Sequence, residues 1–114
     1  MNTTSYLGQS VSVIIDRPLG SKHPTHSFIY GVNYGYIPNT MSPDGEELDA
    51  YVLGVDKPID KTTGICIAVI HRTNDHDDKF VVTPNGKDFS DTQIEKLVDF
   101  QERWFKHIIL RKAI

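Results

Sequence analysis

Acidic side chains are concentrated in two short segments of this 114-residue chain. The first holds Asp44, Glu46 and Asp49 at a Pro-Asp-Gly turn, and the second, residues 75–78, holds Asp75 and Asp77. Carboxylates this close in sequence repel one another unless a cation lies between them. Oxygen ligands suit a hard divalent ion, and Mg²⁺ or Mn²⁺ fits them better than Zn²⁺, for which cysteine and several histidines would be expected. The sequence therefore predicts a metal site.

A solvated turn is the competing interpretation of these acids. Aspartate and glycine are favoured in turns, so Asp44 and Gly45 taken alone are explained equally well without a metal. That interpretation accounts poorly for their combination with Asp49, Asp77 and Lys79. Ca²⁺ also stays open as the ion, although the spacing of residues 44–49 does not match the twelve-residue calcium loop of helix-loop-helix proteins.

Basic residues in a loop near the first strand could bind an anion. Arg17 precedes a proline, and the following loop, residues 19–26, carries Lys22, His23 and His26. Small polar residues, glycine and proline predict that this loop is exposed. It either closes over an anion or is a solvated connection whose charges have no role, and the sequence favours neither interpretation.

Three tyrosines precede the first acidic segment in even register. In a strand, Tyr30, Tyr34 and Tyr36 would point to the same face, where their hydroxyl groups need polar partners or water. The alternative is a half-buried aromatic face of a barrel. The nearby carboxylates favour a role for the tyrosines in a polar site.

The elements that must position these residues are short strands followed by one helix. Strands are indicated by β-branched, aromatic and alternating residues, and the helix by a capping box at Ser90 and Gln93 followed by apolar residues from Ile94 to Ile108. Because no helix separates successive strands, we expect a mainly β protein with a C-terminal helix (α+β). Its fold would be a small OB-like closed or partly closed β-barrel packed by one long helix, in a single domain over residues 1–114. The predicted strands are 11–16, 28–37, 48–53, 65–70 and 80–83.

Composition and charge exclude several classes of protein. The net charge is −3 and the basic residues are scattered, which argues against a nucleic-acid surface. No apolar run could span a bilayer, and the N-terminus lacks the pattern of a secretory signal, so a cytoplasmic location is expected. Cys66 is the one cysteine and lies in an apolar run, so we expect a small buried side chain and no disulfide.

The segment Asn-Tyr-Gly-Tyr-Ile at 33–37, followed by Asp-Gly-Glu-Glu-Leu-Asp at 44–49, resembles the soluble family I inorganic pyrophosphatases. In that family an Asn-Tyr-Gly-Tyr segment precedes an Asp-x-Asp-x-x-Asp metal motif. The likeness continues in Asp-Asp-Lys at 77–79 and in the final helix, and it covers most of the chain from Val11 onward. It implies metal-dependent hydrolysis of pyrophosphate to two phosphates by a metal-activated water, with Mg²⁺ or alternatively Mn²⁺ as cofactor. A homo-oligomer is compatible with it.

The resemblance also implies roles for individual residues. Glu46 falls where the family has an aspartate that handles the attacking water, and it is one methylene longer. The loop before Tyr30 is shorter than the family's hairpin, so the basic residues at 17–23 are the candidates to replace its cations. The implied residues are Glu46, Asp49 and Tyr34 for catalysis; Arg17, Lys22, His23, Tyr30, Tyr34, Lys79 and Lys106 for substrate binding; and Asp44, Asp49, Asp75 and Asp77 for metal, with Asn74 as an alternative to Asp75.

Two other functions stay open. The shortened loop could open the site to a larger phosphorylated compound, which would make the protein a phosphohydrolase of different specificity. Alternatively, the protein could be a non-catalytic relative that binds metal and phosphate without turnover.

Overall fold

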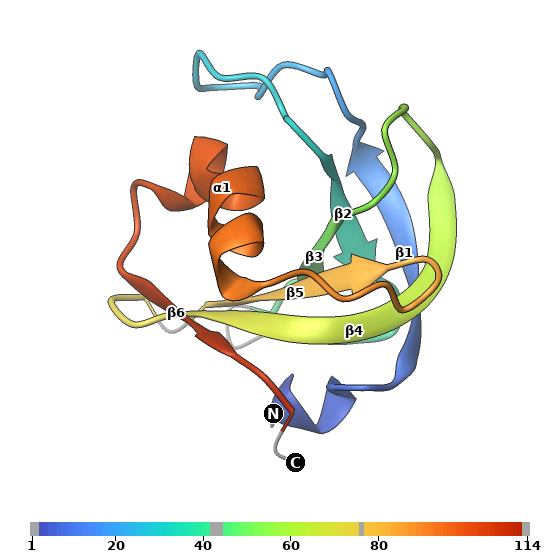
Figure 1. Cartoon of the computed structure of the whole chain (residues 1–114). Coiled ribbons are helices and arrows are strands. Elements are labelled where there is room, and N and C mark those ends of the chain that lie inside the picture. The colour runs from blue at the N-terminus through green and yellow to red at the C-terminus, as the bar shows by residue number, and fades with distance from the viewer. Residues whose placement is uncertain (1–2, 42–44, 76, 113–114) are drawn as a thin grey trace.

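The computed structural model describes residues 3–41, 45–75 and 77–112, and its strands form a closed barrel. The barrel strands are β1 (Ser10–Arg17), β2 (Asn33–Ile37), β3 (Leu48–Val52), β4 (Lys61–Arg72) and β5 (Asp78–Thr83). They pair in the order β1-β2-β3-β5-β4, and a β1–β4 pairing closes the ring (Figure 1). The predicted mainly β barrel with a C-terminal helix is therefore confirmed, and the barrel is closed.

The long strand β4 makes the closure possible. Its first half pairs with β1 and its second half with β6 (His107–Leu110), while β5 runs along its other edge. Figure 1 shows β4 curving around much of the barrel. All neighbouring strands are antiparallel except β3 and β5, which run parallel.

Alternation along the strands divides the buried side chains into two clusters. In β3, Leu48, Ala50 and Val52 point into the barrel and pack with apolar residues of β1, β4 and β5. Tyr51 points to the outer face and belongs to the second cluster, together with Leu53, the residue that follows the strand. The opposite faces predicted for residues 48–53 are thus confirmed, and Asp49 is placed on the outer face.

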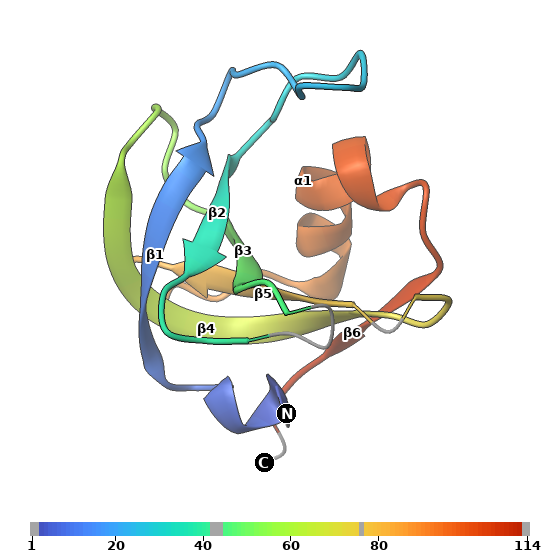
Figure 2. The same cartoon turned by 180° about the vertical axis from the view of Figure 1, so that it is seen from behind.

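The helix α1 (Asp91–Glu102) covers that outer face. It begins at the predicted capping box, in which the Ser90 hydroxyl accepts from the Gln93 amide and the Gln93 side chain accepts from the Ser90 amide. Ile94 and Val98 are fully buried against the outer face of β2, β3, β4 and β5. Figure 2 shows α1 from behind, on the same side of the barrel as the loop that joins β1 to β2.

Three predicted boundaries are wrong by four residues or more. The strand predicted from residue 65 begins at Lys61. The helix ends at Glu102, with Arg103 as its C-terminal cap, and does not reach Ile108, because residues 107–110 pair with β4 as a strand. The second strand begins at Asn33 and not at residue 28, because the Tyr30 amide donates to the Ser21 carbonyl and so belongs to the loop. Among the described residues, no helix is both long and apolar enough to span a bilayer.

Gly35 marks a close approach between the barrel strands β2 and β1. A Cβ atom at this position of β2 would lie 1.9 Å from the carbonyl oxygen of Ile14 in β1. No side chain fits there, since real contacts of a Cβ atom with oxygen are far longer. The glycine of the Asn-Tyr-Gly-Tyr segment is thus required by barrel packing.

Candidate functional site

A buried lysine joins two of the predicted acids. Lys79 of β5 is 4% exposed, and its Nζ donates to Asp49 Oδ2 at 2.5 Å and to Asp77 Oδ2 at 2.8 Å. Asp49 and Lys79 are register partners in the parallel pair β3–β5, and both side chains point to the outer face. The sheet register therefore brings together an acid and a base that lie 30 residues apart in the sequence.

Tyr34 lies against this cluster. It is 9% exposed, and its ring packs on Tyr51 with 4.8 Å between the ring centroids. Burial raises the pKa of the Tyr34 hydroxyl above its ordinary value, despite the opposing effect of Lys79. Burial alone would lower the pKa of Lys79, but Tyr34, Asp49 and the Asp77 hydrogen bond together raise it. At neutral pH the site thus contains a neutral phenol and a charged ammonium.

A cavity of about 890 Å³ opens above the cluster, between the barrel and the helix. Its lining includes the buried residues Arg72, Lys79, Tyr30 and Tyr34, whereas His26 and Trp104 line it from the exposed side. Burial raises the pKa of Asp16, at another edge of the cavity, although the neighbouring Arg17 opposes the shift. The complete lining is Asp16, Arg17, His23, Pro24, His26, Ser27, Phe28, Tyr30, Tyr34, Asp49, Arg72, Lys79, Gln101, Trp104 and Phe105.

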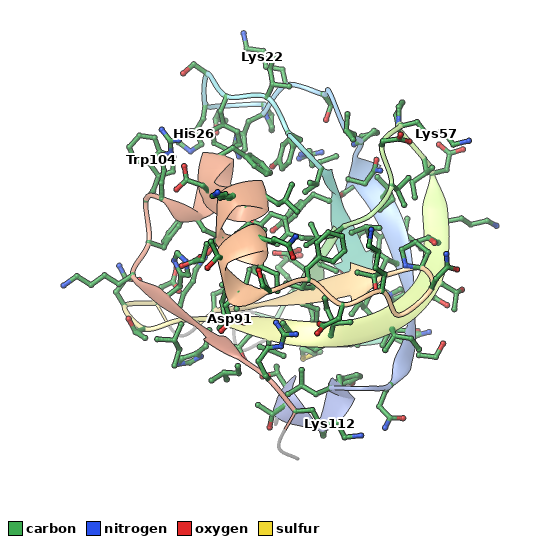
Figure 3. All side chains as sticks on the ribbon, viewed as in Figure 1. Lys22, His26, Lys57, Asp91, Trp104 and Lys112 are labelled. Carbon is green, nitrogen blue, oxygen red and sulfur yellow. The ribbon has the colours of Figure 1, made fainter. Side chains whose placement is uncertain are left out.

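The loop between β1 and β2 folds back on itself over this cavity. The Gly20 amide donates to the Tyr30 carbonyl, the His23 amide donates to the Phe28 carbonyl, and an isolated bridge lies between these two pairs. The predicted exposed loop is therefore a short hairpin-like arm. His26 of this arm and Trp104, which follows the helix, both line the cavity and are labelled in Figure 3.

A chain of buried hydrogen bonds runs from the helix to the strands. Arg72 Nε and Nη2 donate to Glu102 Oε1 and Oε2 at 3.0 and 2.6 Å. The Tyr51 hydroxyl donates to Glu102 Oε2 at 2.6 Å and accepts from Gln101 Nε2 at 2.7 Å. Gln101 Oε1 in turn accepts from the Tyr30 hydroxyl at 3.2 Å. These bonds fix the end of α1 against the cavity wall.

Five of the predicted substrate-binding residues line the cavity, and two do not. Lys22 is exposed and points away from the molecule in Figure 3, and its backbone pairs with Ile29 across the arm. Lys106 is also exposed, because the helix has already ended and the Lys106 carbonyl accepts from the Thr73 amide. The residues that do line the cavity are Arg17, His23, Tyr30, Tyr34 and Lys79.

Only part of the predicted metal set is brought together. Asp49 and Asp77 converge on Lys79, whereas Asp75 points toward Arg72, with 3.7 Å between its Oδ2 and Arg72 Nη1. Asp44 lies outside the described residues. Within residues 3–41, 45–75 and 77–112, no three histidine, cysteine, aspartate or glutamate side chains are grouped closely enough to hold a metal.

Of the predicted catalytic residues, Asp49 and Tyr34 lie at the cavity and Glu46 does not line it. Glu46 is exposed, in the segment between β2 and β3. The role of Glu46 in handling water stays a prediction.

Sequence reasoning missed Arg72, Gln101 and Glu102. A signal for the two helix residues was present, because 94, 98, 101 and 102 follow the spacing of one buried helix face, and the last two are polar. Polar residues at core positions indicate a buried hydrogen-bond network. Arg72 follows the apolar strand run, and its side chain is buried by contacts with Glu102 of the helix and with Phe105, which are distant in sequence.

The comparisons with known proteins agree with this fold and these motifs. A family model for inorganic pyrophosphatase matches residues 10–110. The inorganic pyrophosphatase of Rickettsia bellii is 27% identical over 106 residues, which are 89% of this chain and 58% of the relative. That of Rickettsia prowazekii is 31% identical over 85 residues, which are 70% and 49%. The chain thus spans less than two thirds of the length of these curated relatives.

Solved structures share the fold at low sequence identity. The inorganic pyrophosphatase of Ehrlichia chaffeensis has a TM-score of 0.73 at 19% identity, over 92% of this chain and 87% of that chain. The enzyme of Helicobacter pylori has a TM-score of 0.66 at 19% identity, over 90% and 82%. Because the family model covers most of the sequence and the barrel is shared, this chain belongs to the inorganic pyrophosphatase family.

Proposed function

We propose that this protein is a metal-dependent inorganic pyrophosphatase that hydrolyses pyrophosphate to two phosphates. The observation that carries the proposal is the convergence of Asp49 and Asp77 on Lys79, with Asp49 and Lys79 lining a cavity, in a chain of this family. The relatives named above are inorganic pyrophosphatases, and the activity is proposed for this chain by that likeness.

The donor set fits a hard divalent ion. Mg²⁺ is usually held by one or two carboxylates, with water and substrate phosphates completing its coordination. Asp49 and Asp77 already hold one cation, the Lys79 ammonium, at the point where they meet. These two residues would hold Mg²⁺, or alternatively Mn²⁺, with Asp44 and Asp75 as further candidate ligands. When bound, the ion would neutralise phosphoryl oxygens and lower the pKa of a water molecule.

The residues of the chain would bind and orient the charged substrate. Lys79 is held in place by two carboxylates, and in the complex its ammonium would stabilise negative charge on a phosphoryl oxygen. Tyr34 is a neutral hydrogen-bond donor at this position, because a phenol is protonated at neutral pH and burial raises the pKa of this hydroxyl further. Arg17 and His23 line the open side of the cavity, where they would meet the outer phosphate.

The direct test measures phosphate release from pyrophosphate with Mg²⁺ for the wild type and for Asp49→Asn. We expect the variant to lose about a hundredfold or more in rate, because the loss of a preorganised charge costs this much in other active sites. Asp99→Asn is the matched control, since Asp99 lies on the exposed side of α1 and pairs with Arg103. A wild type that releases no more phosphate than Asp49→Asn would refute the proposal.

A larger phosphorylated substrate is the second candidate, and the size of the cavity favours it. Cavities of about 300–1,000 Å³ hold drug-sized ligands, and this one, at about 890 Å³, is far larger than pyrophosphate. Its outer wall of His26, Phe28 and Trp104 would suit a planar organic group. Rates with pyrophosphate, tripolyphosphate and nucleotides separate the two candidates, since a clear preference for pyrophosphate removes the second.

A non-catalytic relative makes a different prediction for the same protein. It would bind Mg²⁺ and phosphate in a calorimeter and release no phosphate from any of these substrates.

Residues 1–114 are proposed to form one pyrophosphatase-like domain in the cytoplasm, acting on a small molecule and not on nucleic acid. The family match over residues 10–110 and the net charge of −3 support this proposal. A homo-oligomer is compatible with the family resemblance, and sedimentation of the purified protein tests it.

A further inference from the structure

A buried arginine that lines the cavity has one guanidinium nitrogen without a hydrogen bond to the described residues. Arg72 is the last residue of β4, its side chain is 7% exposed, and it lines the cavity. Glu102 binds one edge of the guanidinium group through Nε and Nη2. The Phe105 ring covers one face, with 3.6 Å between its centroid and the guanidinium carbon. These contacts fix both the plane of the group and its rotation.

The third nitrogen of the Arg72 guanidinium group, Nη1, does not bind Glu102. Asp75 Oδ2 lies 3.7 Å from it and Asp77 Oδ2 lies 3.8 Å from it, beyond hydrogen-bond distance in both cases. Among the described residues no acceptor is hydrogen-bonded to Nη1. Because Arg72 lines the cavity, a donor that forms no hydrogen bond within the described residues can donate to a ligand there.

The partner on the other edge is fully engaged. Glu102 is 0% exposed, and its two oxygens accept from Arg72 and from the Tyr51 hydroxyl. The carboxylate therefore neutralises the arginine and leaves its orientation no freedom.

We infer that Arg72 is a substrate-binding residue that donates from Nη1 to a phosphoryl oxygen, and that Glu102 positions it. A guanidinium group matches the geometry of phosphate oxygens and stays charged at any working pH. Lys79 of β5 lines the same cavity as Arg72 of β4, so the two cations would bind one anion from different strands. The inference rests on the proposed function, because it takes the ligand to be pyrophosphate or a compound that contains it.

The test measures binding without turnover. The probe is imidodiphosphate with Mg²⁺, a pyrophosphate analogue whose bridging nitrogen resists hydrolysis. Affinity is measured by calorimetry and by the fluorescence of Trp104, which lines the cavity and is the only tryptophan in the sequence.

Arg72→Lys keeps a positive charge beside Glu102 and removes Nη1. We expect it to bind the probe about tenfold to a hundredfold more weakly, which is the usual effect of losing one charged hydrogen bond. Arg103→Lys is the matched control, since Arg103 is an exposed arginine at the C-terminal cap of α1 and binds Asp99. Its affinity should equal that of the wild type.

A second variant covers the case in which the first does not fold. Arg72→Met combined with Glu102→Gln removes both buried charges and keeps an acceptor for the Tyr51 hydroxyl, and neutral replacement of a buried ion pair is often tolerated. Weak binding by either folded variant supports the inference. Wild-type affinity in a folded variant, or a wild type that does not bind the probe, overturns it. A wild type that binds the probe but hydrolyses nothing overturns the proposed function and leaves the inference in place.

Discussion

Replacing Lys79 with methionine removes the buried ammonium that holds Asp49 and Asp77 together. Methionine has a similar length and fills the same space, so the variant changes the charge and leaves little cavity. The two carboxylates then face each other without a cation. The stability of this variant therefore reports directly on whether the acids converge.

The size of the effect follows from the distances. Asp49 Oδ2 lies 2.5 Å and Asp77 Oδ2 lies 2.8 Å from the same Nζ, so the two oxygens are at most about 5 Å apart. At that distance two unit charges repel by about 3 kcal/mol at an effective dielectric constant of about 20, and by about 0.8 kcal/mol in water. Because the side chains are 36% and 27% exposed, we expect a loss of about 1–3 kcal/mol.

Thermal unfolding in EDTA measures this loss. For a chain of this size, about 1 kcal/mol corresponds to about 4 °C, so Lys79→Met should melt about 4–12 °C below the wild type. Mg²⁺ at millimolar concentration should restore more stability to the variant than to the wild type, because the acids no longer have a competing ammonium. Hydrolysis of pyrophosphate should fall by about a hundredfold or more.

Lys96→Met is the control, since Lys96 is exposed on α1. It should melt with the wild type and respond to Mg²⁺ as the wild type does. The reasoning is refuted if Lys79→Met is as stable as the wild type in EDTA, or if Mg²⁺ stabilises the two proteins equally.

Two further predictions concern stability. Gly35→Ala should lower the free energy of unfolding in urea by about 3 kcal/mol or more, because its Cβ would lie 1.9 Å from the Ile14 carbonyl oxygen. Gly31→Ala is the control, since its Cβ would meet nothing closer than 3.6 Å. Equal costs for the two variants would contradict the packing argument. Both ring nitrogens of His107 face acceptors, the Phe105 carbonyl at 2.8 Å and Glu95 Oε1 at 2.6 Å, so only the protonated ring donates to both. Burial lowers the pKa of His107, but these bonds raise it above its ordinary value. The stabilisation by protonated His107 is then complete below the pKa of the unfolded state and is lost as pH rises through the higher pKa of the folded state. His107→Gln should therefore lower the free energy of unfolding by about 0.2–1 kcal/mol at pH 5.5 and by less at pH 8.5. A cost independent of pH would contradict this prediction.

Much of the barrel could be predicted from the sequence because the signals are local. Alternation in residues 48–53 depends only on the two-residue period of a strand, and the structure confirms both faces. The capping box at Ser90 and Gln93 depends on residues three apart, and the helix begins there. The burial of Cys66 follows from its apolar neighbours and is also confirmed.

The end of the helix could not be predicted in this way. The apolar residues up to Ile108 continue a helical spacing, but residues 107–110 gain strand partners in β4. Hydrogen bonding to a distant strand overrides a local pattern, because a sheet edge satisfies backbone groups that the helix end would leave exposed. The same reason places Tyr30 in the arm of the loop and not in β2.

The sequence by itself determined the residue types available to the site: the acids at 44–49 and 75–77, the tyrosines and Lys79. Tertiary structure decided which of them meet. Asp49 and Lys79 are 30 residues apart, as are Arg72 and Glu102, and each pair is joined by sheet register or by packing of the helix on the sheet. Local propensity acts over a few residues along the chain, whereas charge and hydrogen bonding act over a few ångströms in space. Only the folded barrel brings residues that are distant in the sequence within the few ångströms at which charges and hydrogen bonds act.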